Sequence, residues 1–178
     1  MQRGWPYDSR TVPTVTEAPA RAPSSPLTAR DPRLAPWRAF VRAQAQVSRR
    51  LDEDLRSEHG LSLQEYVALL FLAEAPERRL RMGRLADSLS LSKSGATRLI
   101  DRLVDDGFVD RVSCSSDLRG AEAALTEAGL DRLRTAAPTH LRGIAEYFLS
   151  AIEGGDLAAV ERSMLCVADK ACTARGRA

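Results

Sequence analysis

The residues best suited to chemistry in this chain lie on one face of a predicted helix between Ser92 and Gly107. The polar positions of this face recur three or four residues apart, at Ser94, Thr97, Arg98 and Asp101. Hydroxyl groups form hydrogen bonds with base edges, and an arginine can donate two hydrogen bonds to guanine O6 and N7. Small residues, including Gly95, let the start of such a helix sink between two phosphate backbones. The pattern predicts a helix that reads the major groove of DNA. The alternative is an amphipathic helix whose polar face is only solvated.

The opposite face of the same segment predicts how the helix is held. Its apolar residues follow a helical spacing and form a stripe that packs against a core: Ala96, Leu99, Ile100, Leu103 and Val104. Ser92 is a suitable N-cap, and Gly107 stands where a C-terminal glycine stops a helix. The residues predicted to contact DNA from this helix are Ser92, Lys93, Ser94, Gly95, Thr97 and Arg98.

The segments on either side complete the motif. Residues 81–90 carry a second, shorter apolar stripe, and a turn at Ser90 and Leu91 separates it from the next helix. Residues 108–113 and 121–125 are predicted as two short strands, with turn-forming residues between them. A helix-turn-helix followed by a hairpin is a winged helix.

In their order and spacing, these motifs resemble those of the MarR family of transcriptional regulators. The matching segments are RLADSLSLSKSGATRLIDRLVDDGFVDR, the turn Asp117-Leu118-Arg119, and Leu125-Thr126-Glu127-Ala128-Gly129. The helical segments on both sides extend the resemblance over about residues 34–172. The resemblance implies a mainly α fold with a small β-wing, in which a winged helix-turn-helix domain joins N- and C-terminal dimerisation helices.

On this basis the chain is expected to have four parts. They are a disordered arm (1–33), an N-terminal dimerisation helix (34–60), a winged helix-turn-helix DNA-binding domain (61–125) and C-terminal dimerisation helices (126–174). The arm contains six of the nine prolines and has no sustained apolar period, so it cannot bury enough surface to offset its ordering entropy. Its five arginines either add non-specific DNA affinity or belong to a plain linker.

Local signals predict the remaining helices. Ser62 and Glu65 form an S-x-x-E capping box that opens an apolar helix over residues 62–73. A later helix is predicted from Thr126 to about Ile152, and Pro138 should kink or split it. A last helix begins near Asp156.

The first helix carries two large aromatic side chains, Trp37 and Phe40, that need a partner surface. Large aromatics dominate protein interfaces, so they are predicted to lie in a dimer core. Alternatively, together with His59, they line a pocket for an effector.

Further basic residues are candidates for DNA contacts. In the resembled family, the arginine of the Asp-x-Arg turn enters the minor groove while the aspartate orients it, which assigns these roles to Arg119 and Asp117. The alternative is an ordinary solvent-exposed turn pair. Arg84 is predicted to contact a phosphate. Other arginines suited to phosphate contacts are Arg78, Arg79, Arg81 and Arg111.

The composition limits other functions. The net charge of +2 is carried entirely by residues 1–33, so DNA binding must depend on where the remaining charges lie. The two histidines, His59 and His140, are far apart and the three cysteines have no CxxC spacing, so neither a metal site nor a cofactor is predicted. No nucleophile–base pair or phosphate-binding glycine loop is visible, which argues against an enzyme.

No segment approaches the roughly 20 apolar residues of a membrane span, and no secretory signal is recognisable. The sequence therefore predicts a cytoplasmic, nucleoid-associated protein that does not engage a membrane.

The predicted function is sequence-specific, DNA-binding regulation of transcription. The resemblance implies a homodimeric repressor that binds a palindromic double-stranded operator and responds to a small aromatic or anionic effector. Two alternatives remain: a winged helix used as a protein-interaction module, and a redox-sensing regulator that uses Cys114.

Overall fold

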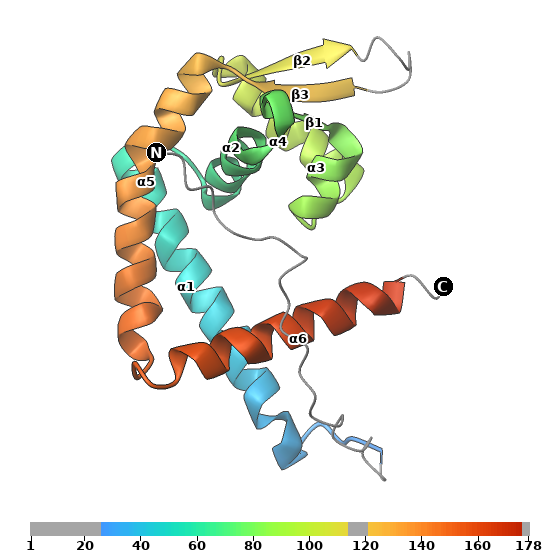
Figure 1. Ribbon diagram of the computed structural model, residues 1–178, viewed down its shortest axis with the longest axis vertical. Coiled ribbons are helices and arrows are strands. Elements are labelled where there is room, and N and C mark those ends of the chain that lie inside the picture. The colour runs from blue at the N-terminus through green and yellow to red at the C-terminus, as the bar shows by residue number, and fades with distance from the viewer. Residues whose placement is uncertain (1–25, 114–120, 176–178) are drawn as a thin grey trace. The chain divides into compact units, whose positions relative to one another are not determined.

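The structure is a computed structural model that describes residues 26–113 and 121–175 (Figure 1). Its elements, in chain order, are α1 (Ala35–His59), α2 (Leu63–Glu74), β1 (Arg79–Arg81), α3 (Met82–Ser88), α4 (Lys93–Asp105), β2 (Val109–Ser113), β3 (Ala121–Leu125), α5 (Glu127–Tyr147) and α6 (Leu157–Arg175). Single 3₁₀ turns lie at Pro32–Leu34, Pro76–Arg78 and Leu149–Ala151. A mainly helical chain with one small antiparallel sheet confirms the predicted fold class.

The described residues form two compact units. The winged-helix unit is Val47–Ala145 and contains α2 to α4 and the sheet. The terminal unit combines residues 26–46 with 146–175. Helices α1 and α5 each contribute residues to both units.

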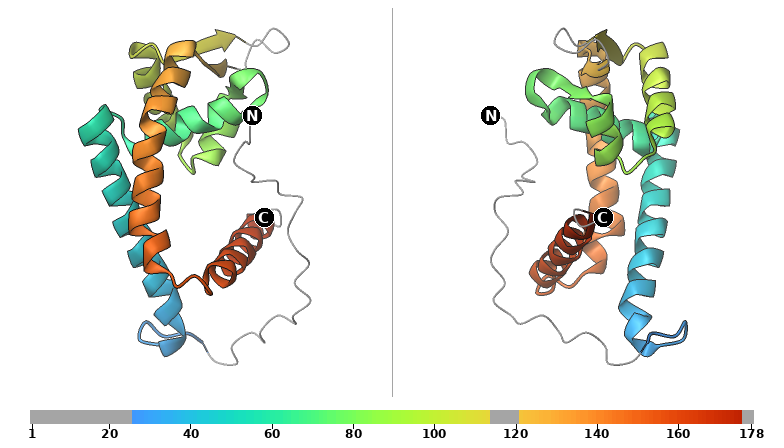
Figure 2. Two further views of the ribbon diagram at one scale, coloured as in Figure 1. Left: turned by 60° about the vertical axis from the view of Figure 1, so that its left-hand side comes forward. Right: turned by 90° about the vertical axis from the view of Figure 1, so that its right-hand side faces the viewer.

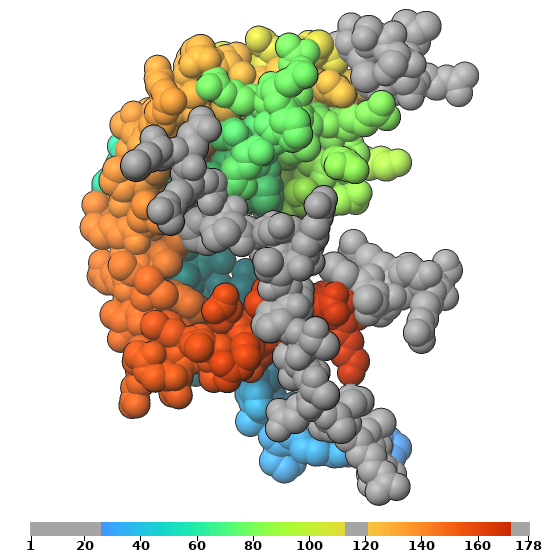
Figure 3. Space-filling model, in the orientation of Figure 1, coloured from blue at the N-terminus to red at the C-terminus, as the bar shows by residue number. Residues whose placement is uncertain are grey.

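The core of the winged-helix unit is built from the apolar stripes of its helices. Its fully buried large side chains come from α1, α2, α3, α4 and β2, and they include Leu55, Leu69, Leu72, Leu85, Ile100, Leu103 and Val109. The buried stripe of α4 consists of Ala96, Leu99, Ile100 and Leu103, as its spacing predicts. Figure 3 shows the atoms of α3, α4 and the strands closely packed on the face in view.

The sheet has the order β1-β3-β2, and both pairings are antiparallel. The hairpin partners β2 and β3 have the predicted positions, and Val109 pairs with Leu125 at the inner end. Strand β1 was not predicted, because the alternation of a three-residue strand is too short to recognise. It places Leu80 opposite Ala123 at the edge of the core.

Helix α2 starts with the predicted capping box. Ser62 Oγ accepts a hydrogen bond from Glu65 N–H at 3.2 Å, and the Glu65 carboxylate accepts one from Ser62 N–H at 2.9 Å. Leu61 and Tyr66 flank this turn, and both are buried in the core. Both donors at the start of α2 are thus satisfied by side chains.

In the winged-helix unit, α1 and α5 lie side by side (Figure 2). Thr139 Oγ1 donates to Glu58 Oε2 at 2.8 Å and lies 2.8 Å from His59 Nε2. Arg142 also pairs with Glu58, and the Arg132 guanidinium donates to the carbonyl of His59. Two residues of α1 and three of α5 therefore form a polar seam along the two helices.

Of the two predicted effects of Pro138, a kink or a split of the helix, the split is wrong, because α5 runs uninterrupted from Glu127 to Tyr147. Pro138 is exposed, while Ala136 and Thr139 beside it are buried. Packing on both sides of the proline holds the helix together despite the missing N–H group. The helix ends five residues before the predicted Ile152, and a 3₁₀ turn follows.

The terminal unit leaves many large apolar side chains exposed. On α1 these are Trp37, Phe40 and Val41; on and before α6 they are Phe148, Leu149, Leu157, Met164 and Val167. The rings of Trp37 and Phe40 lie 6.0 Å apart. An apolar groove of about 790 Å³ lies along α6 and the 3₁₀ turn before it. No helix in residues 26–113 and 121–175 combines the length and apolar character that crossing a bilayer requires.

Candidate nucleic-acid interface

The candidate interface is built on α3 and α4, which form a helix-turn-helix. Helix α3 ends at Ser88, just before the predicted turn at Ser90 and Leu91, and Ser90 adopts a positive φ of 53° in that turn. The turn is closed by a 2.9 Å hydrogen bond from Leu91 N–H to the carbonyl of Ala86. Leu85 and Ala86 of α3 are buried in the core, and this packing fixes the start of α4.

The first turn of α4 uses its hydroxyls partly for its own stability. Ser92 Oγ accepts a hydrogen bond from Gly95 N–H at 3.1 Å and lies 3.2 Å from Ser94 Oγ. A side chain at Gly95 would place its Cβ 3.2 Å from Ser92 Oγ, so the glycine makes room for the cap. Thr97 Oγ1 donates to the carbonyl of Lys93 at 2.9 Å. Thr97 therefore has its donor satisfied within the helix, and its exposed methyl group is suited to a thymine methyl.

Three cationic side chains of α3 and α4 have no acidic partner among the described residues. Lys93, Arg98 and Arg84 are all exposed, and within residues 26–113 and 121–175 none of them forms an ion pair. Ser92, Ser94 and Thr97 are exposed beside them, and Gly95 is half-buried. The residues predicted on these two helices are thus accessible to solvent, although Gly95 is only partly so.

Other charged residues near this surface are already paired. Asp101 of α4 binds Arg111 of β2 at 2.5 Å, and Arg102 of α4 binds Glu65 of α2 at 3.0 Å. Arg78 binds Glu127 at 2.6 Å. Asp101 and Arg111 thus connect the recognition helix to the wing strand. Neither is available to DNA without losing its partner.

Glu65 keeps its negative charge despite being half-buried. Burial raises the pKa of a carboxyl group, but here it is outweighed by the hydrogen bond from Ser62 N–H and by the hydrogen bond and positive charge of Arg102. The net pKa of Glu65 lies below its ordinary value. The Glu65–Arg102 pair is therefore ionised at neutral pH.

The end of α4 is fixed to the start of α5. Gly107 adopts a positive φ of 73°, and its carbonyl accepts a 2.9 Å hydrogen bond from Thr126 Oγ1. The same hydroxyl oxygen caps α5 by accepting from Gly129 N–H at 3.0 Å. A Cβ at Gly129 would lie 2.1 Å from the carbonyl oxygen of Phe108. Only glycine permits this approach.

Three of these positioning residues, Glu65, Thr126 and Gly129, were not predicted to support the site. The capping box identified Glu65 as a helix cap, but its contact with Arg102 joins residues 37 positions apart and leaves no local signal. Thr126 and Gly129 belong to a motif of the resemblance, but no spacing rule reveals that they contact residues 107 and 108.

The wing tip lies outside the described residues, and this includes the predicted contacts Asp117 and Arg119 as well as Cys114. The described part of the wing consists of β2 and β3, paired up to Ser113 and Ala121. The hairpin predicted from the sequence is thus present on both sides of the segment whose sequence contains Asp117 and Arg119.

Trp37 and Phe40 belong to the terminal unit, whereas His59 belongs to the winged-helix unit, where it contacts Thr139 of α5. The alternative of an effector pocket lined by these three residues stays a prediction. In the described part of the chain, no three His, Cys, Asp or Glu side chains are grouped so that they could hold a metal ion.

Comparison with known proteins agrees with this geometry. A family model described as MarR family matches residues 59–120. The HTH-type transcriptional repressor YetL of Bacillus subtilis is 35% identical over 86 residues, which are 48% of this chain and 52% of YetL. The match therefore spans about half the length of that repressor. The HTH-type transcriptional regulator YkoM of the same organism is 32% identical over 113 residues, which cover 63% of this chain and 71% of YkoM.

Two solved structures from Streptomyces coelicolor extend the likeness to most of the chain. AbsC, a MarR family transcriptional regulator, has a TM-score of 0.74 and 30% identity, covering 86% of this chain and 100% of AbsC. Sco3205, a MarR family transcriptional regulator solved in complex with DNA, has a TM-score of 0.74 and 31% identity, covering 85% of this chain and 92% of its own. With its exposed recognition helix and β-wing, the chain belongs to the MarR family of winged-helix transcriptional regulators.

Proposed function

We propose that this protein is a homodimeric repressor that binds a palindromic operator through α4. The observation that carries the proposal is the outer face of that helix. Arg98 is exposed there and has no ion pair within residues 26–113 and 121–175, so its guanidinium is available to a guanine edge. The similarity to Sco3205, which was solved in complex with DNA, supports DNA binding by this chain.

The proposed contacts divide into two kinds. Arg98, Ser94 and Thr97 face the base edges, while Ser92, Lys93 and Arg84 bind phosphates on either side. Gly95 allows close approach of the backbone. Asp117 and Arg119 are proposed to act in the minor groove from the wing tip.

A homodimer is proposed because of the apolar surface of the terminal unit. In a single chain Trp37 is 59% exposed and Val167 is 55% exposed, with further large apolar residues around each. Surfaces of this kind mark interaction sites. A two-fold dimer would place two α4 helices about 34 Å apart, one turn of B-DNA, which calls for a palindromic site.

Repression is proposed from the names of two relatives, and effector response is proposed from the family resemblance alone. YetL of Bacillus subtilis and MprA of Escherichia coli are both named transcriptional repressors. We propose the same mode here, with a small aromatic or anionic effector favouring a dimer geometry that no longer fits the operator. A thermal-shift screen of small aromatic acids tests the effector, since a ligand that binds the native state raises its Tm.

The DNA-binding role is tested with purified protein and the DNA upstream of its own coding sequence, titrated at several salt concentrations. We expect specific binding that weakens steeply with salt, because each phosphate contact releases counterions. A randomised duplex selection then defines the operator. Binding that is absent or equal for all duplexes would contradict the proposal and favour the protein-interaction module.

A further inference from the structure

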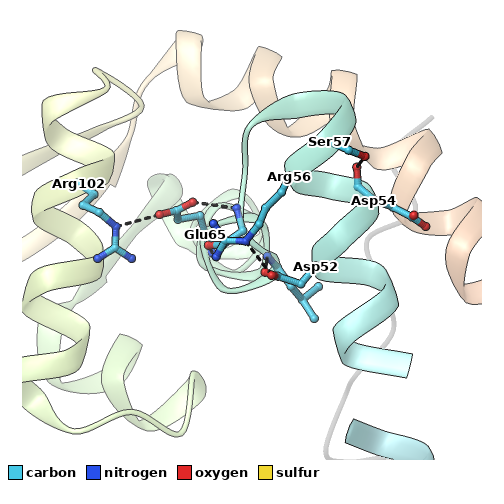
Figure 4. A network of polar contacts seen from close by, with 8 residues as sticks. Asp52, Asp54, Arg56, Ser57, Glu65 and Arg102 are labelled. Carbon is cyan, nitrogen blue, oxygen red and sulfur yellow. Dashed lines mark hydrogen bonds and ion pairs between the residues drawn. The ribbon is translucent and has the colours of Figure 1, made fainter. Parts of the chain in front are cut away.

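The contacts of Glu65 reach from the first turn of α2 to the recognition helix (Figure 4). Its Oε2 accepts a hydrogen bond from Ser62 N–H at 2.9 Å, and its Oε1 accepts one from Arg102 Nε at 3.0 Å. The Glu65 side chain is only 13% exposed, against 56% for Arg102. One carboxylate therefore closes the capping box of α2 and holds α4 at the same time.

Asp52 fixes the same turn of α2 to α1. Its Oδ1 accepts a hydrogen bond from Leu63 N–H at 2.8 Å, and its Oδ2 pairs with Arg56 Nε at 2.7 Å. The start of α2 is thus bound on one side to α1, through Asp52, and on the other side to α4, through Glu65. These contacts form a continuous line from α1 to the recognition helix.

Arg102, which Glu65 binds, lies one helical turn from Arg98, the residue proposed to contact a base. Arg102 follows Arg98 by four positions, and its guanidinium also donates to the carbonyl of Arg98 at 3.3 Å. The preceding residue, Asp101, pairs with Arg111 of β2. Adjacent residues of an α-helix point about 100° apart, so the two pairs hold α4 from different directions.

We propose that Glu65 is a positioning residue for DNA recognition, because it fixes the rotation of α4 through Arg102 and so sets where Arg98 points. This rests on the proposed function of α4. If Glu65 instead acted only through its charge, the expected effect of removing that charge on DNA affinity would be the opposite. A carboxylate near bound DNA repels phosphates and occupies an arginine, so removing its charge would then strengthen binding.

The first experiment compares wild type with Glu65→Gln on the selected operator and on unrelated DNA. Glutamine keeps an oxygen that can accept the Ser62 N–H bond, but it loses the charged pair. We expect specific binding to weaken roughly tenfold, the equivalent of one strong positioning interaction, while binding to unrelated DNA changes little. Equal or tighter operator binding would overturn the proposal.

Ser62→Ala is the matched control for helix stability. It removes the bond from Glu65 N–H to Ser62 Oγ at the same turn but leaves the Glu65 carboxylate in place. We expect its operator affinity to stay within about twofold of wild type. If it weakens operator binding as much as Glu65→Gln does, the effect belongs to α2 stability and the positioning role is refuted.

A second variant, Arg102→Gln, changes an exposed residue and keeps the test decisive if Glu65→Gln folds poorly. Positioning predicts weaker operator binding with an unchanged salt dependence. A salt slope shallower by about 0.9 would mean that Arg102 contacts a phosphate itself, which would overturn the proposal. If the wild-type protein shows no preference for any duplex, that result contradicts the proposed function itself and not the positioning role of Glu65.

Discussion

Arg98, like Arg84, has a guanidinium without an acidic partner among the described residues, whereas several nearby arginines are paired. Arg102 and Arg111 bind carboxylates of the same unit, and Arg78 binds Glu127. A paired arginine must break its ion pair before it can bind a phosphate or a base. In the described chain Arg98 and Arg84 carry no such partner, so a protein with a net charge of only +2 can still present a local cationic surface.

Arg98→Ala should reduce operator affinity by about 1 to 3 kcal/mol and relax the preference at one base pair in each half-site. Arg84→Ala is the matched comparison: it should weaken all duplexes about equally and make the salt slope shallower by about 1, as expected for a phosphate contact. Titration against single-base variants of the operator measures both effects. Uniform loss in Arg98→Ala would reassign this residue to the backbone.

Gly129→Ala should destabilise the fold by about 3 kcal/mol or more, because its Cβ would lie 2.1 Å from the Phe108 carbonyl and the backbone would have to move. Gly83→Ala is the control, since nothing lies within 4 Å of a Cβ there. It should stabilise α3 by up to about 1 kcal/mol. Urea unfolding at fixed protein concentration measures both. A Gly129→Ala variant as stable as wild type would contradict the close approach.

The recognition helix is held by contacts from three other elements. Glu65 of α2 binds it near the middle, Arg111 of β2 binds the neighbouring position, and Thr126 before α5 binds the residue that ends it. Each contact joins residues distant in sequence or on separate elements. The direction of α4 is therefore a property of the whole winged-helix unit, while its helical conformation is encoded locally.

The packing of α5 on α2 should make stability depend on pH near neutrality. The His140 ring lies 4.4 Å from the Tyr66 ring, and its Nδ1 is buried without a hydrogen-bond partner in the described chain. Burial lowers the pKa of His140 below 6.5, so the unfolded state binds more protons between the folded pKa and 6.5. Stability is full above about pH 6.5 and falls as the pH is lowered, by at most about 1.4 kcal/mol per pH unit.

His140→Phe keeps a ring against Tyr66 but cannot titrate. We expect its unfolding free energy to be nearly constant from about pH 6.5 to 5, where wild type loses stability. His59→Gln is the comparison, because His59 has a hydrogen-bond partner in Thr139. It should keep the wild-type decline. Chemical denaturation at several pH values decides between the two histidines, and a decline that persists in His140→Phe would assign the titration elsewhere.

The sequence predicted elements whose signals are local. The apolar stripe of α4, its Ser92 cap, the capping box at Ser62 and the β2–β3 hairpin all appear as expected. Strand β1 was missed because it exists only through pairing with β3. The helix through Pro138 persists because burial on both sides of the proline outweighs local propensity. Ion pairs such as Glu65 with Arg102 are contacts between distant segments, so no spacing rule could reveal them.

At the scale of the molecule, the two units differ in how their apolar residues are buried. The winged-helix unit buries most of its large aliphatic side chains, and many of them are fully buried. In the terminal unit the large apolar residues of α6 remain 37% exposed at Leu157, 40% at Met164 and 55% at Val167. Burial of such residues stabilises by about 25 cal/mol per Å², so a second surface that covers them would contribute substantially to stability. We have proposed a second copy of the chain as that surface.

Met164→Glu should convert the proposed dimer to a monomer, because a charge would enter the apolar groove along α6 and would have to be buried on association. Ala159→Glu adds the same charge to an exposed position of α6 that does not line the groove, and it should leave the dimer intact. Light scattering after size exclusion gives the mass of each variant. A monomer binds one half-site and loses the affinity gained when two linked DNA-binding domains bind together. The operator affinity of Met164→Glu should therefore fall by at least about a hundredfold, while its affinity for unrelated DNA should fall far less. A Met164→Glu dimer, or a monomer that binds the full operator as tightly as wild type, would show that the groove does not join two recognition helices.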